Sequence, residues 1–305
     1  MSQQQKALTQ PAMGRRQARW RNAMAAYGFL LPYIGFFMTF QLIPTLAGIG
    51  LSFTKWELLE GTREFVGLRN FASLGADSLF WLSFYNSFYF AVLTTLGNFV
   101  VSLSAALALR TIRRGQTFFR VLLYAPVVLS ISVVGIIWQR VLSNNGLINY
   151  YLAWLGIPAI SFLGNAKLVI PSLSLTTVWW GFGFPMLIFL SGLYAIPESL
   201  YEAARLDGAV GWASFSRITL PLLRPALLLV LVTQFIAHMQ VFGQPYILTQ
   251  GGPGYASYPL ILYLYQTAWR YYHMGYAASM AIALAVFMLI VSLLQFRLLG
   301  ERVEY

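Results

Sequence analysis

Six long apolar segments place the strongest constraint on what this chain can fold into. A helix of about 20 residues crosses the roughly 30 Å hydrocarbon core of a bilayer, and each segment reaches that length. Only 10% of the residues are charged, against about 25% in an ordinary soluble domain. The pattern therefore predicts an all-α integral membrane protein with six transmembrane helices. The expected spans cover residues 24–53, 84–109, 121–141, 168–192, 226–247 and 275–298.

The lysines and arginines predict how these helices are oriented. Fourteen of the 20 lie in the two tails and in the second–third and fourth–fifth connections, and six lie in the other connections. Such an excess marks the cytoplasmic side, so both termini and the fourth–fifth connection are expected there. The first segment is too long for a cleaved signal peptide. The expected parts are a cytoplasmic tail at 1–23, a six-helix domain at 24–298 with a cytoplasmic loop at 197–225, and a tail at 299–305.

Several function classes can be excluded from composition. The net charge of +11 does not indicate nucleic-acid binding, because the cations flank the apolar segments, where anionic lipid headgroups lie. The chain has no cysteine and only two histidines, which excludes disulfides and thiolate metal sites and argues against a metal cluster. It has no G-x-x-x-x-G-K-[ST] motif to cradle ATP phosphates. An intramembrane enzyme would need a nucleophile–base or metal constellation, and none is found.

The fourth–fifth connection contains the stretch ESLYEAARLDGAVGWASFSRITLPLLRP, residues 198–225. Ser199 and Glu202 are spaced as a capping box, which predicts a helix over about residues 200–207. Gly208 is expected to end it in a left-handed conformation, and Pro221 and Pro225 are expected to fix the return to the fifth span. A helix of two turns is marginal alone and needs something to dock against. From these residues alone, a capped connector between spans is an equal alternative.

The same loop resembles the EAA signature of the permease subunits of binding-protein-dependent ABC importers. Residues 65–71, 146–149 and 251–253 resemble the carbohydrate-uptake group of that family, which includes maltose-type and glycerol-phosphate-type permeases. The resemblance implies a type I ABC importer permease fold, in which the loop helix is a coupling helix that sits in a cleft of a separate cytoplasmic ATPase. The ATPase-coupling residues that it implies are Glu202, Ala203, Ala204, Asp207, Gly208, Leu220 and Pro221.

Two outer connections are expected to be structured. Residues 146–152 are expected to form a short interfacial helix, with their tyrosines at headgroup depth. The glycines and proline of residues 251–254 predict a tight turn.

Polar residues in the fifth span are candidates for a solute site, because such residues are costly in a bilayer unless they line a cavity or find partners. Gln234 and His238 are four residues apart and share a helix face, which Val241 continues. The resemblance implies that these three positions line the sugar site. The alternative is hydrogen bonding between helices. In the third and fourth spans the further candidates, for which packing is the alternative, are Thr177, Trp180, Phe182 and Ser130.

The expected function is that of a permease subunit that moves a carbohydrate inward. The uncharged candidates favour a neutral di- or oligosaccharide over glycerol phosphate. The resemblance implies a second permease subunit, in a heterodimer rather than a homodimer, two ATPase subunits that hold ATP and Mg²⁺, and an extracytoplasmic solute-binding protein. No cofactor is expected on this chain, and the plasma membrane of a prokaryote is its expected location. The alternative is a self-powered secondary carrier, against which the absence of carboxylates within the spans argues.

Overall fold

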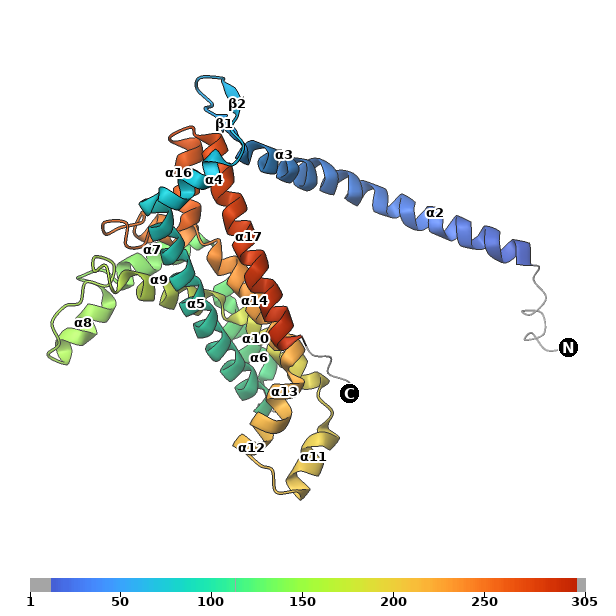
Figure 1. Ribbon diagram of the computed structural model, residues 1–305. Helices are drawn as coiled ribbons and strands as arrows, with labels where there is room; N and C mark the ends of the chain where they lie inside the picture. The colour runs from blue at the N-terminus through green and yellow to red at the C-terminus, as the bar shows by residue number, and fades with distance from the viewer. Residues whose placement is uncertain (1–11, 113, 301–305) are drawn as a thin grey trace.

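Helices make up most of the computed structural model, which describes residues 12–112 and 114–300 (Figure 1). Lys6, Arg113 and Arg302, which entered the orientation argument, lie outside the described residues, as do 1–11 and 301–305 of the expected tails. Six spans result, as predicted, when each of two bent helix pairs counts as one span. The other four candidate spans are Ala26–Ser52, Ser78–Thr111, Arg224–Leu248 and Met274–Leu299.

The third and fourth spans are each bent rather than straight. α6 (Gln116–Tyr124) and η2 (Ala125–Val128) meet α7 (Ile131–Val141) at 92°, and α9 (Val169–Gly181) meets α10 (Gly183–Ala195) at 53°. In the first pair, Leu129 and Ser130 adopt extended backbone between the helices. In the second pair, Pro185 has no N–H to offer the carbonyl group of Gly181, and its ring crowds that carbonyl. Hydropathy does not register these bends, because the apolar run continues through both.

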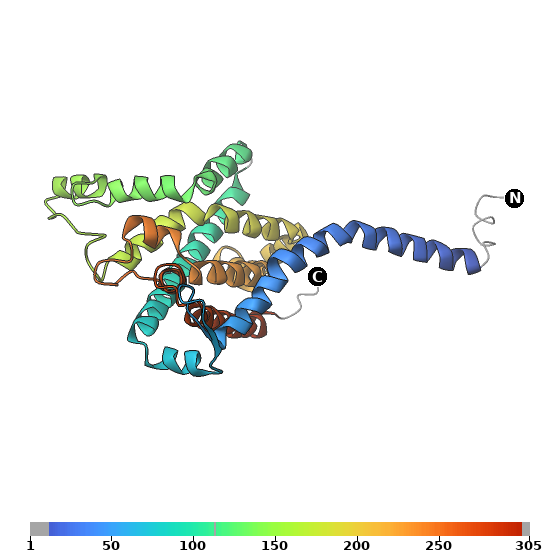
Figure 2. The same cartoon turned by 90° about the horizontal axis from the view of Figure 1, so that it is seen from above.

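The N-terminal segment forms an arm that extends away from the helical body (Figures 1 and 2). α2 (Ala12–Phe37), the π-helical turn η1 (Met38–Leu42) and α3 (Ile43–Ser52) follow one another without interruption. The helix therefore begins inside the expected cytoplasmic tail at 1–23. In its most apolar window none of the residues is buried within the chain, which leaves that surface for lipid or another protein.

Short elements cover the end of the body where the arm attaches (Figure 1). β1 (Thr54–Trp56) pairs antiparallel with β2 (Arg63–Phe65), and α4 (Arg69–Ala76) follows. The short helix predicted in the third–fourth connection is confirmed as α8 (Leu147–Trp154). The tight turn at 251–254 is also confirmed, with φ of +84° at Gly251 and +53° at Gly254.

α5 (Ser78–Thr111) is the central helix of the body. Its 34 residues extend over about 51 Å at 1.5 Å per residue. It packs against α9, α10, α14 (Arg224–Met239) and α16 (Leu260–Trp269). Small side chains allow such close approach in membranes, and a Cβ atom at Gly97 would lie 2.7 Å from Cγ2 of Val178 in α9. The buried polar residues of α5 are Ser83, Asn86, Ser87, Thr94, Thr95, Asn98 and Ser102.

Buried apolar clusters join α5 to its neighbours at both ends. Towards its C-terminus, Leu103 and Leu109 pack with Phe189 of α10 and Leu227 of α14. Towards its N-terminus, a second cluster joins it to α14, α16 and α17 (Met274–Leu299). The remaining elements are α11 (Glu198–Leu206), α12 (Trp212–Ser214), η3 (Phe215–Thr219), α13 (Leu220–Leu222) and α15 (Gly243–Leu248).

Asp77 ties the start of α5 to two other helices. Its carboxylate accepts from the N–H groups of Leu79 and Phe80 as an N-cap, and from the hydroxyl groups of Tyr263 and Tyr276 at 2.7 and 2.6 Å. Burial alone would raise the pKa of Asp77, but the hydrogen bonds from the tyrosines and the two N–H groups outweigh it, so that pKa lies below its usual value.

The close contact of α17 with β1 predicts a strong effect of one methyl group. A Cβ atom at Gly275 would overlap the carbonyl oxygen of Thr54, which is backbone and cannot rotate away. We expect Gly275→Ala to lower the free energy of unfolding by about 1–3 kcal/mol, measured as thermal unfolding of the purified protein in detergent. Gly35→Ala, in α2 with open space around it, is the matched control and should not destabilise. An unchanged midpoint for Gly275→Ala would mean that β1 and α17 are not held together in this way.

The lowered pKa of Asp77 predicts a pH-dependent contribution to stability. Because the charged form is favoured in the folded state, this contribution is present above the ordinary pKa near 3.8 and is lost as the pH falls through the lower folded value. Asp77→Asn should therefore unfold at a lower temperature than wild type at pH 7. The gap between the two midpoints should narrow below about pH 4. A gap that stays constant from pH 7 to pH 3 would contradict the assignment.

Candidate functional site

The predicted loop helix is present as α11, at the end of the body opposite the β1–β2 hairpin (Figure 1). The predicted capping box is wrong, because Pro197 is the N-cap and no side chain caps the helix. Proline already holds φ near −65°, so α11 starts directly after it and Ser199 lies in the first turn. Glu198 places a negative charge at that first turn, which the helix dipole favours.

Two glycines make the turn after α11. Gly208 has φ of +75°, as predicted for a left-handed stop, and Gly211 has φ of +58°. From Trp212 the chain is nearly continuous helix through α12, η3 and α13 into α14. Pro221 and Pro225 lie in the first turns of α13 and α14, a position that tolerates proline. The prediction that these prolines form the return is therefore wrong.

The predicted coupling residues divide into an inward and an outward set. Ala204 is only 7% exposed and packs into the chain itself, although the resemblance implies that it is a coupling residue. Leu220 and Pro221 are half-buried. The exposed members are Glu202, Ala203, Asp207 and Gly208.

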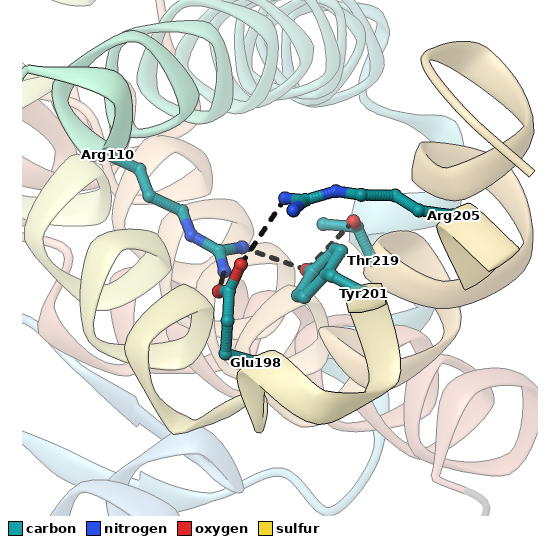
Figure 3. Close-up of polar contacts among 5 residues, drawn as sticks. All are labelled: Arg110, Glu198, Tyr201, Arg205 and Thr219. Atoms are coloured by element: carbon teal, nitrogen blue, oxygen red, sulfur yellow. Dashed lines mark hydrogen bonds and ion pairs between the residues drawn. The ribbon is translucent and has the colours of Figure 1, made fainter. Parts of the chain in front are cut away.

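Arg110, the penultimate residue of α5, holds α11 in place (Figure 3). Its Nη1 donates to the hydroxyl oxygen of Tyr201 at 2.9 Å, and its guanidinium carbon lies 4.5 Å from the centroid of that ring. Its Nη2 pairs with Oε2 of Glu198 at 3.3 Å, and Arg205 pairs with the other carboxylate oxygen at 3.4 Å. The hydroxyl of Tyr201 also lies 3.0 Å from Oγ1 of Thr219, which is buried in η3.

A second set of polar residues meets deep in the bundle, between α5 and α14. Nδ2 of Asn98 donates to Oε1 of Gln234 at 3.0 Å and lies 3.4 Å from Nε2 of His238. Oγ1 of Thr95 lies 3.0 Å from Nδ1 of the same imidazole. The structure thus places Gln234 and His238 on one face of α14, as predicted, and adds two partners from α5. We call Thr95, Asn98, Gln234 and His238 the polar cluster.

The polar cluster has an unused hydrogen-bond acceptor. Asn98 is fully buried, and its Oδ1 has no partner in the described part of the chain. A buried amide oxygen without a donor costs about 1–3 kcal/mol. The carboxamide group of Asn98 lies beside the bend between α9 and α10, because a Cβ atom at Gly181 would be 3.5 Å from its Nδ2. Ser102, one turn further along α5, donates to the carbonyl oxygen of Phe182 in that bend at 2.8 Å.

The other predicted solute-site residues have different roles. Val241 does not continue the face of α14, because that helix ends at Met239; it packs in an apolar cluster with Phe90, whose ring edge meets His238. Thr177 donates to its own helix, at the carbonyl oxygen of Leu173.

Three candidates lie at the helix bends. Trp180 Nε1 donates to the carbonyl oxygen of Leu129 at 3.1 Å, and Ser130 caps α7 by accepting from the N–H of Val133. Phe182 is half-buried and packs against the cluster around Phe189. The contacts of these three residues hold the helices together at the bends.

Sequence reasoning missed Thr95, Asn98 and Arg110. A signal for the first two was available: polar residues recur along α5 at positions 83, 87, 94, 98 and 102, close to the helical repeat, which indicates a buried polar stripe. No such signal exists for Arg110, because a cation at the cytoplasmic end of a span is ordinary.

Residues 98–304 match the family described as "Binding-protein-dependent transport system inner membrane component". The chain is 34% identical to the "Probable ABC transporter permease protein YesP" of Bacillus subtilis (strain 168), over 96% of both chains. It is 31% identical to the "Trehalose/maltose transport system permease protein MalF" of Thermococcus litoralis, over 90% of this chain and 92% of that one. It is 32% identical to the "Arabinooligosaccharides transport system permease protein AraP" of Bacillus subtilis, over 94% and 93%.

A solved structure has the same fold. A chain from a bacterial ABC transporter involved in the import of the acidic polysaccharide alginate superimposes with a TM-score of 0.80, over 95% of this chain and all of that one. The two sequences are 24% identical. This likeness concerns the fold alone.

Proposed function

The chain belongs to the family of binding-protein-dependent transport system inner membrane components, as a multi-pass permease of the ABC sugar importers, and from this premise we propose its specific role. It moves a neutral di- or oligosaccharide from an extracytoplasmic binding protein into the cytoplasm by alternating access. The free energy comes from ATP hydrolysis in a separate subunit.

The polar cluster is the observation that carries the sugar proposal. It consists of two carboxamides, a hydroxyl and an imidazole, all in the bundle, with the buried Oδ1 of Asn98 left without a donor. Sugar hydroxyl groups are donors and acceptors of this uncharged kind, and a hydroxyl group would satisfy that oxygen. Among the described residues the cluster's contacts include no lysine or arginine, which a phosphorylated substrate would call for.

The names of two relatives agree with this substrate class. One is described as a trehalose/maltose permease and another as an arabinooligosaccharide permease. Both names denote neutral di- or oligosaccharides, whereas the solved neighbour carries an acidic polysaccharide at lower sequence identity.

The expected partners follow from the exposed surfaces and the family. Two ATPase subunits, which hold ATP and Mg²⁺, receive α11 through Glu202 and its exposed neighbours. A second, different permease subunit pairs with this chain around the transport pathway, and the binding protein docks at the end that bears the β1–β2 hairpin. In this arrangement α11 and both termini face the cytoplasm of a prokaryotic cell, in agreement with the excess of cations there.

A secondary carrier is not favoured. Such carriers bind their coupling ion at acidic side chains or unwound helices near the midplane. None of the candidate spans, bent pairs included, contains an aspartate or glutamate, and the family to which the chain belongs is described as binding-protein-dependent, which a self-powered carrier is not.

Charge reversal at α11 tests the ATPase coupling. We expect Glu202→Lys, in the complex reconstituted with its partner permease, its ATPase and the solute-loaded binding protein, to lower the binding-protein-stimulated rate of ATP hydrolysis by about tenfold, as expected for loss of one charged contact. Gly208→Val should act in the same direction, because valine at φ of +75° is strained.

The matched control is Arg114→Glu, a charge reversal at an exposed residue of the second–third connection, outside α11. It should leave stimulated hydrolysis as in wild type. If Glu202→Lys and Gly208→Val also respond as wild type, α11 is a connector and the coupling role is lost. A wild-type complex that takes up solute without any ATPase would favour the secondary carrier instead.

Removal of the Asn98 side chain tests the sugar site. Asn98→Ala leaves Gln234 without its donor, so we expect sugar uptake into proteoliposomes to fall by about tenfold while loaded binding protein still stimulates ATP hydrolysis. Ser83→Ala, which removes a fully buried and unpartnered hydroxyl group from α5, is the control and should transport normally. Equal uptake by both variants would mean that the cluster only joins helices.

A further inference from the structure

α5 connects the polar cluster to α11. Asn98 and Arg110 lie on the same helix, 12 residues or about 18 Å apart, with no proline or break between them. A helix of this kind moves as one piece, so a displacement at Arg110 is carried to Asn98.

α14 connects the same two places by a second route. Thr219 in η3 leads through nearly continuous helix to Gln234, 15 residues or about 22 Å further on. The polar cluster is thus formed by α5, which ends beside α11 at Arg110, and by α14, which Thr219 reaches through α13.

The hydroxyl group of Tyr201 lies between these two ends. It is 2.9 Å from Nη1 of Arg110 and 3.0 Å from Oγ1 of Thr219 (Figure 3). It can accept from the guanidinium and donate to the threonine at the same time. One atom of α11 therefore contacts α5 directly, and reaches α14 through η3 and α13.

We propose that Arg110, Tyr201 and Thr219 form a joint through which movement of α11 is passed to α5 and α14 together, and so to the polar cluster. Tyr201 and Arg110 are positioning residues in this joint. The inference rests on the proposed function, because it takes α11 as the element that the ATPase moves, and it adds the path by which that movement reaches the solute site.

The contacts rank the members of the joint. The side chain of Glu198 is 60% exposed, and an ion pair in such a position contributes little because water and salt screen it. Arg110 is 22% exposed, lies over the ring of Tyr201 and donates to its hydroxyl. Water and salt therefore screen the contact between Arg110 and Tyr201 less than the ion pair between Arg110 and Glu198. The joint therefore depends on Tyr201 more than on Glu198.

The test compares Tyr201→Phe, Thr219→Val, Arg110→Gln and Glu198→Gln in the reconstituted complex. Binding protein is purified with the sugar it retains from cell extract, so the sugar need not be known. The rate of ATP hydrolysis is measured together with the amount of sugar released inside the vesicles, which is determined by mass spectrometry. Their ratio is the amount of sugar transported per ATP hydrolysed. We expect this ratio to fall by about tenfold in the first three variants and less than about twofold in Glu198→Gln. The double variant Tyr201→Phe/Thr219→Val should be no worse than Tyr201→Phe alone, since both remove the same connection.

Arg114→Gln is the matched control, because Arg114 lies exposed in the connection that follows Arg110 and α5, and it pairs with no residue that the structure describes. It should keep the wild-type ratio. If Tyr201→Phe keeps that ratio in an assembled complex, the joint is overturned, and this substitution removes a single oxygen, so assembly is expected to survive it. A ratio that falls equally in Glu198→Gln and Tyr201→Phe also overturns the ranking on which the joint rests. If the wild-type complex shows no stimulation by loaded binding protein, it is the proposed function that fails, and the joint fails with it.

Discussion

The need to satisfy every backbone polar group away from water governs this structure. In hydrocarbon that need permits helices, and it permits a broken helix only where protein groups take over the freed hydrogen bonds. The α6–α7 bend is satisfied in this way, because the indole N–H of Trp180 donates to the carbonyl oxygen of Leu129. At the α9–α10 bend the carbonyl oxygen of Phe182 accepts from the N–H of Met186 and also from the hydroxyl group of Ser102, which ties α5 to this bend. The polar cluster therefore lies beside a bent pair of helices, as solute sites in transporters do.

The sequence predicted the parts of the fold that follow from hydropathy and local chemistry. The six spans, α8, the turn at 251–254 and the left-handed Gly208 each depend on residues close together in the chain. Thr95, Asn98 and Arg110 were missed because their importance comes from partners about 90 to 140 positions away. Gln234 and His238 were found because their spacing of four residues is visible along one helix.

The errors at the loop have a common cause, which is competition between equally good local signals. Ser199 and Glu202 form an acceptable capping box, but Pro197 two residues earlier already starts the helix. Pro221 and Pro225 look like a turn, yet Gly208 and Gly211 turn the chain first and leave the prolines at tolerated helical positions. Where a proline and a glycine both suggest the end of a helix, the chain turns at the glycine, because glycine adopts a positive φ at little cost and proline cannot adopt one.

The distribution of charge supports the proposal that the energy for transport enters at α11. The candidate spans, bent pairs included, contain no aspartate or glutamate, so no carboxylate is present there to take up a coupling ion. The ion pairs among Arg110, Glu198 and Arg205 gather instead at the end of the body, around the short helix that exposes Glu202. A helix as short as α11 is not stable alone, and it is held by the contacts of its Tyr201 with Arg110 of α5 and Thr219 of η3. In the proposed function, an element that is held in this way on one side and exposed on the other can pass a push from a partner to both of its contacts.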